Sequence, residues 1–134
     1  MNKLTGKIVA LETSPHMSMV DVDVDGDVFC SIVLETPASA AYLKQGQPVT
    51  LLFKEAEVSI GKNLSGLISL RNRFKGTVKQ LEKSPILTKV FLEYKKGQVV
   101  SIISTRSAQK LALAPGDEVE WLVKTNEVSL LNEV

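Results

Sequence analysis

The stretch Asn72-Arg73-Phe74-Lys75-Gly76-Thr77-Val78 repeats the pattern of Asn2-Lys3-Leu4-Thr5-Gly6-Lys7-Ile8 at a distance of 70 positions. The same displacement matches Leu11-Glu12 with Leu81-Glu82, Ser14-Pro15 with Ser84-Pro85, Ser31-Ile32 with Ser101-Ile102, Gly46 with Gly116, Lys54 with Lys124 and Glu57-Val58-Ser59 with Glu127-Val128-Ser129. One compensated slip is expected, where Asp25-Gly26 is set against Lys96-Gly97. These identities predict a duplicated unit of about 65 residues, with copies at 1–62 and 67–134 joined by a small, polar stretch.

Each copy shows mostly the two-residue periodicity of β-strands. Val20 to Val24 alternates without a fault, and Asp25-Gly26 after it predicts a hairpin with 28–34. The other predicted strands are 4–12, 48–53 and 58–60 in the first copy, and 74–82, 90–94, 99–103, 119–123 and 128–130 in the second. Short helices are expected at 37–43, after Thr36 as N-cap, and at 107–111. Five strands and one short helix per copy predict an all-β chain of tandem OB-like barrels.

The composition excludes several functional classes. Sixteen basic and fifteen acidic side chains give a net charge of +1, which argues against a nucleic-acid-binding surface. The single cysteine, Cys30, cannot form an internal disulfide, and no export signal opens the chain, so we expect a cytoplasmic protein. No apolar run reaches the roughly 20 residues that span a bilayer. One histidine and one cysteine make a His/Cys metal site or a Cys/His nucleophile improbable, and we predict no catalysis.

An acidic motif in the first hairpin has a structural explanation. Asp21, Asp23, Asp25 and Gly26 match the opening of a calcium-binding EF-hand loop, but the twelfth position is Ile32 instead of glutamate. The interleaved valines predict a solvated strand face instead. Cys30 and Trp121 stand among apolar residues, so Cys30 is expected to be buried and Trp121 to pack in the core or in an interface.

Two short polar segments have the donor groups that an oxyanion needs. Ser69-Leu70-Arg71-Asn72 precedes the first strand of the second copy, and Lys124-Thr125-Asn126 lies between its last two strands. Hydroxyl, amide and cationic groups are natural donors to a dianion, and the first and last strands of a barrel often lie close together. Ser104 and Ser107, at the start of the second short helix, add further hydroxyls. On residue types alone, ordinary turn and cap chemistry is the favoured explanation of these segments over anion binding.

The second copy also resembles a known family. Ser69 to Val78 is similar to the S-A-R-N-x-x-x-G-x-V signature of the molbindin (Mop, or TOBE-type) family, and Lys124 to Val128 is similar to its K-A-[ST]-x-V element. The duplicated layout resembles the two-unit members. This resemblance implies cytoplasmic binding of molybdate or tungstate for storage or homeostasis, without a catalytic cofactor. It also implies a homo-oligomer, with a trimer favoured, whose anion sites are shared between units or subunits.

The resemblance assigns roles in the second copy residue by residue. Ser69, Arg71 and Asn72 would donate to the anion, and Lys124 with Thr125 would close the pocket. Ser104 and Ser107 match the family's T-x-x-S and would reach a neighbouring unit's anion. Leu70 and Thr125 replace the family's alanines, which would narrow the pocket.

The first copy departs further from the signature. It begins at Met1-Asn2 without a preceding Ser-Ala-Arg, and Leu34 and Pro37 replace the two serines. Glu55 follows Lys54, and its carboxylate would repel a dianion. We therefore expect fewer or weaker sites from this copy, with Lys54 and Asn2 as its best contributors.

Two other functions stay open at this point. A regulatory or accessory module would change its association with a partner chain on anion binding, although the sequence has no helix-turn-helix or P-loop. An OB-type nucleic-acid-binding protein would show salt-sensitive affinity for oligonucleotides.

If the chain binds an oxyanion, the size of the cavity must distinguish molybdate and tungstate from sulfate, because all three are dianions.

Overall fold

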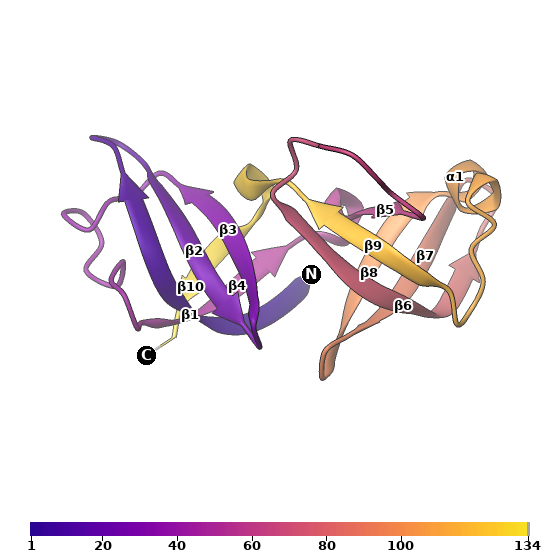
Figure 1. The fold of residues 1–134 in the computed structure, drawn as a ribbon, viewed down its shortest axis with the longest axis horizontal. Helices are drawn as coiled ribbons and strands as arrows, with labels where there is room; N and C mark the ends of the chain where they lie inside the picture. Colours follow the sequence, from indigo (N-terminus) through magenta and orange to yellow (C-terminus); the bar gives the residue numbers. More distant parts are fainter. Residues whose placement is uncertain (134) are drawn as a thin grey trace. The chain divides into compact units, whose positions relative to one another are not determined.

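Two curled, five-stranded antiparallel sheets make up most of the chain in this computed structural model, which describes residues 1–133 (Figure 1). The first repeat contributes β1 (Asn2–Thr13), β2 (Ser18–Val24), β3 (Asp27–Val33), β4 (Pro48–Phe53), the 3-10 helix η1 (Glu55–Glu57) and β5 (Ser59–Gly61). The second repeat contributes β6 (Asn72–Lys83), β7 (Leu87–Tyr94), β8 (Gly97–Ser104), α1 (Thr105–Lys110), β9 (Glu118–Val123), η2 (Thr125–Glu127) and β10 (Ser129–Asn132). These elements confirm the predicted tandem OB-like, all-β fold.

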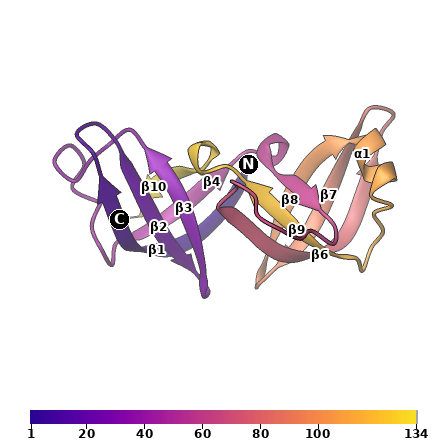
Figure 2. The same ribbon diagram turned by 45° about the horizontal axis from the view of Figure 1, so that its top comes forward.

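The two repeats exchange their last strands. One sheet has the order β10-β4-β1-β2-β3 and the other the order β5-β9-β6-β7-β8, so each repeat's final strand pairs in the sheet of the other repeat (Figure 2). The compact units are therefore Met1–Phe53 with Lys124–Val134, called the first unit below, and Lys54–Val123, called the second unit. The boundaries 1–62 and 67–134 stay a prediction about the sequence repeats, and the units in space do not follow them.

Two equivalent buried serines hold the exchanged strands. Ser31 Oγ donates to the carbonyl of Val128 at 2.6 Å within the first unit. Ser101 Oγ donates to the carbonyl of Val58 at 2.6 Å within the second unit. Each serine therefore satisfies a buried backbone acceptor that comes from the other repeat, and an unsatisfied acceptor there would be costly.

The cores follow from the strand alternation. In β2 the residues alternate between buried and half-buried, which places Val20, Val22 and Val24 inside and Asp21 and Asp23 on the outer face. The outer aspartates therefore belong to a strand, as predicted. In the second unit the fully buried Trp121 packs against Phe74 and Tyr94, with ring centroids 5.4 and 5.1 Å away. Cys30 is also buried, so both interior predictions are confirmed.

The predicted slip between the repeats is wrong. Val24 pairs with Asp27 in the first hairpin, and Tyr94 pairs with Gly97 in the second, so the displacement of 70 continues through both turns. The second turn therefore lies at residues 95–96 instead of Lys96-Gly97. The β-bulges also keep this displacement, because they lie between Ile8 and Ala10 in β1 and between Val78 and Gln80 in β6.

Only the second repeat forms its expected short helix. Ser104 caps α1 by accepting from the Ser107 amide at 3.0 Å. The helix ends with Ala112 at φ +49°, where the Ala112 amide donates to Gln109 and the Leu113 amide donates to Ala108. This pair of bonds is a Schellman motif, whose left-handed residue is usually glycine.

The helix predicted at 37–43 is not formed, and turns occupy this segment. Ser39 explains part of the difference, because its hydroxyl accepts from the Thr36 amide and donates to the Thr36 carbonyl. Such local bonds compete with helix formation. Leu34 occupies the position of the capping Ser104 and has no oxygen to accept the first amides.

In residues 1–133, no helix is long and apolar enough to cross a membrane.

Candidate functional site

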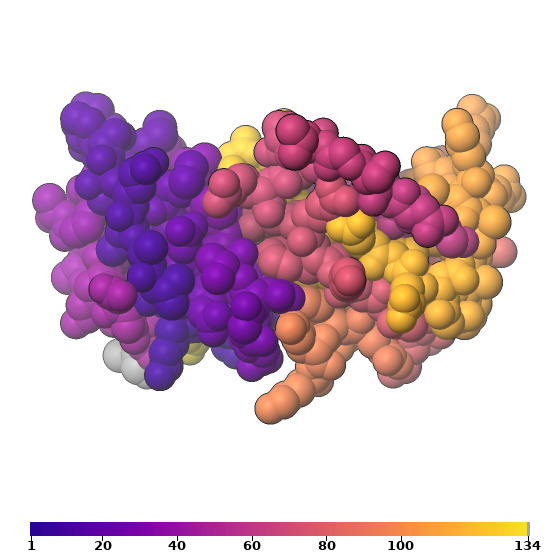
Figure 3. All heavy atoms as spheres, in the orientation of Figure 1, coloured from indigo at the N-terminus to yellow at the C-terminus, as the bar shows by residue number. Residues whose placement is uncertain are grey.

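Asn72 begins strand β6 with its side chain fully buried, at 0% exposure. It pairs with Val123 at the end of β9. Ser69 and Arg71 precede it in the connecting segment 62–71, and both are exposed. This segment runs over the surface of the second unit (Figure 3). The signature residues thus combine one buried amide with an exposed hydroxyl and an exposed guanidinium at the start of one strand.

Lys124 and Thr125 follow β9 directly. Lys124 is the exposed residue before η2, and Thr125 is half-buried at the start of that 3-10 helix. Because Val123 pairs with Asn72, the chain places Lys124 one residue beyond the partner of Asn72. Lys124 and Thr125 belong to the first unit and Asn72 to the second, so the approach of the two polar segments stays a prediction.

The first repeat has an equivalent but poorer arrangement. Asn2 begins β1, is 5% exposed and pairs with Phe53. Lys54 follows Phe53 and is exposed, and the half-buried Glu55 comes next. The first repeat therefore keeps the buried asparagine and the lysine, and Met1 stands at the position of Arg71.

Ser104 and Ser107 lie at the opposite end of the sheet from Asn72. Ser104 pairs with Leu87 at the start of β7, and the next residue of β7, Thr88, pairs with Lys83. Lys83 is the last residue of β6, whereas Asn72 is its first. The Ser104 hydroxyl donates to the Ser107 hydroxyl at 2.8 Å, and both serines are exposed. Within the second unit, the structure does not bring these serines together with Asn72.

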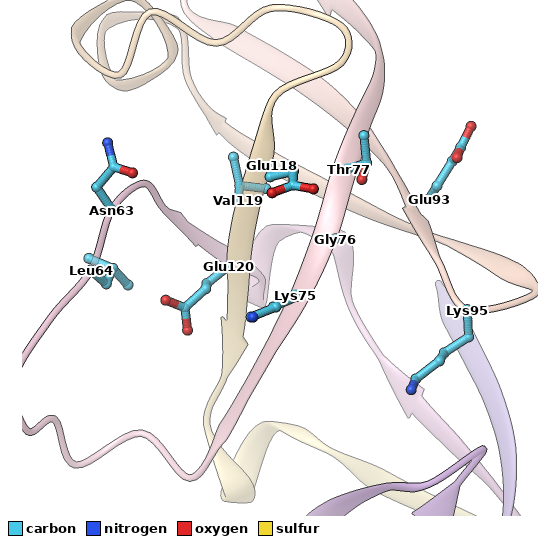
Figure 4. Close-up of a pocket in the computed structure, with 10 residues that line it drawn as sticks. All are labelled: Asn63, Leu64, Lys75, Gly76, Thr77, Glu93, Lys95, Glu118, Val119 and Glu120. Atoms are coloured by element: carbon cyan, nitrogen blue, oxygen red, sulfur yellow. The ribbon is translucent and has the colours of Figure 1, made fainter.

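A cavity of about 500 Å³ lies elsewhere in the second unit (Figure 4). Its lining consists of Asn63, Leu64, Lys75, Gly76, Thr77, Glu93, Lys95, Glu118, Val119 and Glu120. Three carboxylates against two lysines make it unsuited to a dianion. The cavity contains none of the residues predicted to bind an oxyanion, so we do not assign the oxyanion site to it.

Two ion pairs in the second unit were not anticipated from the sequence. Arg73 is hydrogen-bonded to Glu120, and this bond holds the pKa of the Glu120 carboxyl below its usual range. Lys62 Nζ donates to Asp117 Oδ2 and to the Leu111 carbonyl, each at 3.0 Å, and thereby fastens the connecting segment beside the end of α1. Strand register could have suggested the first pair, because Arg73 pairs with Leu122, and Glu120 lies two residues from Leu122 on the same face of β9. Nothing local in the sequence indicates the second.

Metal coordination by His, Cys, Asp and Glu side chains has no candidate in residues 1–133. No group of three or more of these side chains there is arranged to hold an ion. The donor set at Asn72 instead consists of neutral and cationic hydrogen-bond donors.

Comparison with known sequences identifies the family. The TOBE domain pattern matches residues 1–60 and again residues 68–130. The chain belongs to the TOBE domain family. Both TOBE repeats begin before their buried asparagine, so the family pattern includes the Asn2 and Asn72 positions.

Relatives of this TOBE protein carry names connected with molybdenum. The molybdenum transport protein ModE of Herbaspirillum seropedicae is 28% identical over 130 residues, which cover 95% of this chain and 48% of ModE. Molybdenum-pterin-binding protein 1 of Clostridium pasteurianum is 38% identical over 65 residues, which cover 48% of this chain and 96% of that protein. This chain thus spans about half the length of ModE.

A solved structure matches the whole fold. The cytoplasmic molybdate-binding protein ModG, crystallised with molybdate bound, superposes with a TM-score of 0.92 at 28% sequence identity. The match covers 98% of this chain and 96% of ModG. This chain therefore shares its tandem TOBE architecture with ModG over almost its whole length.

Proposed function

We propose that this chain binds molybdate, and tungstate as its near-isostere, as a binding protein for cytoplasmic storage of the oxyanion. The observation that carries this proposal is the similarity of the entire chain to ModG, whose crystals contained molybdate. The donor chemistry at the start of β6 supports it, because hydroxyl, amide and guanidinium groups follow one another there. Storage of the oxyanion requires saturable binding and no chemical step in which a bond is made or broken.

Each residue contributes a donor of a different kind. The Arg71 guanidinium offers paired N–H groups and a fixed positive charge, the Asn72 amide offers a positioned donor on a buried side chain, and the Ser69 hydroxyl adds a third. Lys124 and Thr125 supply an ammonium and a hydroxyl to the same oxyanion. Fixed donors spaced for molybdate leave the smaller sulfate with stretched hydrogen bonds, so size discriminates where charge does not.

Ser104 and Ser107 have a different place in this proposal. They lie at the other end of the sheet from Asn72, so they serve an anion held by a neighbouring copy of the chain in a homo-oligomer, for which a trimer is the favoured state. Lys54 and Asn2 are the corresponding contributors of the first repeat.

Isothermal titration with molybdate, tungstate and sulfate tests the function. We expect saturable heat with the first two and at least tenfold weaker binding of sulfate. The double variant Arg71→Ala, Lys124→Ala should lose molybdate binding, while Lys110→Ala, an exposed lysine on α1, serves as the matched control. Absence of molybdate heat and of thermal stabilisation at millimolar concentration contradicts the function. Unchanged affinity in the double variant contradicts only the site.

A second candidate is an anion-sensing accessory module. The similarity to ModE favours it, because this chain spans only 48% of that protein. This function requires a partner chain whose association changes when molybdate binds. Sedimentation of the purified protein in cell extract, with and without molybdate, separates the two, since a storage protein keeps the same mass in both.

A further inference from the structure

The hairpin between β1 and β2 carries a histidine and two methionines at its tip. Its loop is Pro15-His16, and the Ser14 amide donates to the Met17 carbonyl at 2.9 Å to close it. Met17 stands directly before β2, and Met19 is the second residue of that strand. All of these residues belong to the first unit, and the proposed oxyanion site uses none of them.

The two methionine side chains lie on one face of the hairpin. Residues 17–19 are exposed, buried and half-buried in turn, so Ser18 points inward while Met17 and Met19 point outward together. Two residues of extended chain separate their Cα atoms by roughly 6.6 Å. Both side chains line one cavity of about 170 Å³, whose lining also includes Glu12 and Ile32, the cross-strand partners of Met19. The two flexible thioether chains therefore border the same small space.

The fold does not require these donor side chains. Met17 is 45% exposed, so it contributes little to the core of the first unit. The second repeat closes the same hairpin, because the Ser84 amide donates to the Leu87 carbonyl at 2.9 Å. That hairpin lacks all three donors at the equivalent positions, which are Ile86, Leu87 and Lys89. The same backbone thus forms with and without the sulfurs and the imidazole.

These donors suit a soft monovalent cation. Thioether sulfur is a soft ligand that selects Cu(I), and imidazole nitrogen is a further copper ligand. His16 is exposed beside Met17, where its ring is accessible to an ion. The Glu12 carboxylate in the cavity lining favours a positive charge there. Magnesium and calcium prefer oxygen ligands, so they do not compete for thioethers.

We propose that Met17, Met19 and His16 form a binding site for Cu(I) at the tip of the β1–β2 hairpin. Two thioether sulfurs and one imidazole nitrogen hold the ion, and Glu12 supplies a nearby negative charge. The site lies at the end of β1, whereas Asn2 begins that strand. The inference is independent of the proposed function and stands whether or not the chain binds molybdate.

Competition with the chromophoric chelator bicinchoninate, under anaerobic and reducing conditions, tests the inference on the full chain. We expect the unchanged protein to take up a single equivalent of Cu(I). Met17→Leu combined with Met19→Leu should lose this uptake, because leucine conserves the volume but has no sulfur. His16→Gln should weaken the uptake. Cys30→Ala is the matched control and should keep it, since the Cys30 thiol is buried at 3% exposure.

NMR of isotopically labelled methionine methyl groups locates the ion. Ag(I), a redox-inert analogue of Cu(I), should shift the Met17 and Met19 methyl signals. The Met1 signal should stay in place, because Met1 precedes the opposite end of β1. Zn(II) should shift none of the three, since it prefers harder ligands than thioethers.

The second repeat offers a gain-of-binding variant. Ile86→His combined with Leu87→Met and Lys89→Met places the three donors on the equivalent hairpin, and a second equivalent of Cu(I) uptake is expected. Because this variant gains binding, it tests the inference even if the double methionine variant fails to fold.

Four results would overturn the inference, with circular dichroism verifying that each variant is folded. Uptake that persists in the double methionine variant, or that disappears in Cys30→Ala, means that another group holds the ion. Methionine methyl signals that ignore Ag(I) exclude the thioethers as ligands. Unchanged uptake in the second-repeat variant shows that the three donors do not make a site.

Discussion

Removing the Ser31 hydroxyl tests the exchange of the last strands. Ser31 is fully buried, and its hydroxyl donates to the carbonyl of Val128, which lies 97 positions later in the chain. Ser31→Ala leaves this buried acceptor unsatisfied, at a cost of about 1–3 kcal/mol. Because the bond lies within the first unit, we expect that unit to be destabilised and the second unit to be unaffected.

Hydrogen exchange followed by mass spectrometry locates the effect. A loss of about 1–3 kcal/mol corresponds to roughly 5- to 150-fold faster exchange of amides that open with the unit. The account predicts faster exchange in β3, β4 and β10, with unchanged protection in β5. Ser101→Ala is the mirror control, and it should expose β5 and leave β10 protected, because Ser101 holds Val58.

The alternative pairing predicts the reverse pattern. If each repeat folded with its own last strand, Ser31 would contact the segment around Val58, and Ser31→Ala would deprotect β5 instead of β10. That result would refute the exchanged topology.

Three further predictions concern stability. Gly6→Ala should lower the free energy of unfolding more than Gly76→Ala. The added Cβ would lie 2.3 Å from a carbonyl oxygen of β2 at position 6 and 3.2 Å from a carbonyl oxygen of β7 at position 76. Thermal unfolding should show a loss of about 1–3 kcal/mol for Gly6→Ala. Ala112→Gly should stabilise by about 1 kcal/mol, because glycine adopts φ +49° without the steric cost that alanine incurs, and a lower urea midpoint would contradict this. Lys62 lowers the pKa of Asp117 by a hydrogen bond, so their stabilising contribution is present above the unfolded carboxyl pKa of about 3.9 and disappears as the pH falls through the lower folded value. Lys62→Met should therefore lower the urea midpoint more at pH 7 than near pH 2, where only the loss of the Lys62 bond to the Leu111 carbonyl remains.

The sequence predicted the fold well because its signals are local. The alternation of β2, the Asp25-Gly26 turn and the repeated Gly6 and Gly76 positions each concern a few neighbouring residues. The exchange of strands was not predictable in this way, since β5 and β10 have the same pattern and either would fit either sheet. The choice of partner depends on distant contacts such as Ser31 with Val128.

The candidate site was predictable in its residue types and only partly in its arrangement. The structure shows that Asn72 is buried and pairs with Val123, while its convergence with Lys124 stays a prediction. Periodicity could not show that Ser104 lies at the far end of the same sheet, because this follows from the lengths of the paired strands.

A tungstate-soaked crystal offers the most direct test of the oxyanion site. Anomalous scattering from tungsten locates the anion independently of any assumption about its ligands. The account predicts a peak whose oxygens lie at hydrogen-bonding distance, about 3 Å, from Arg71 and Asn72. A peak at Asn2 alone, or a crystal with no tungsten at either asparagine, would contradict it.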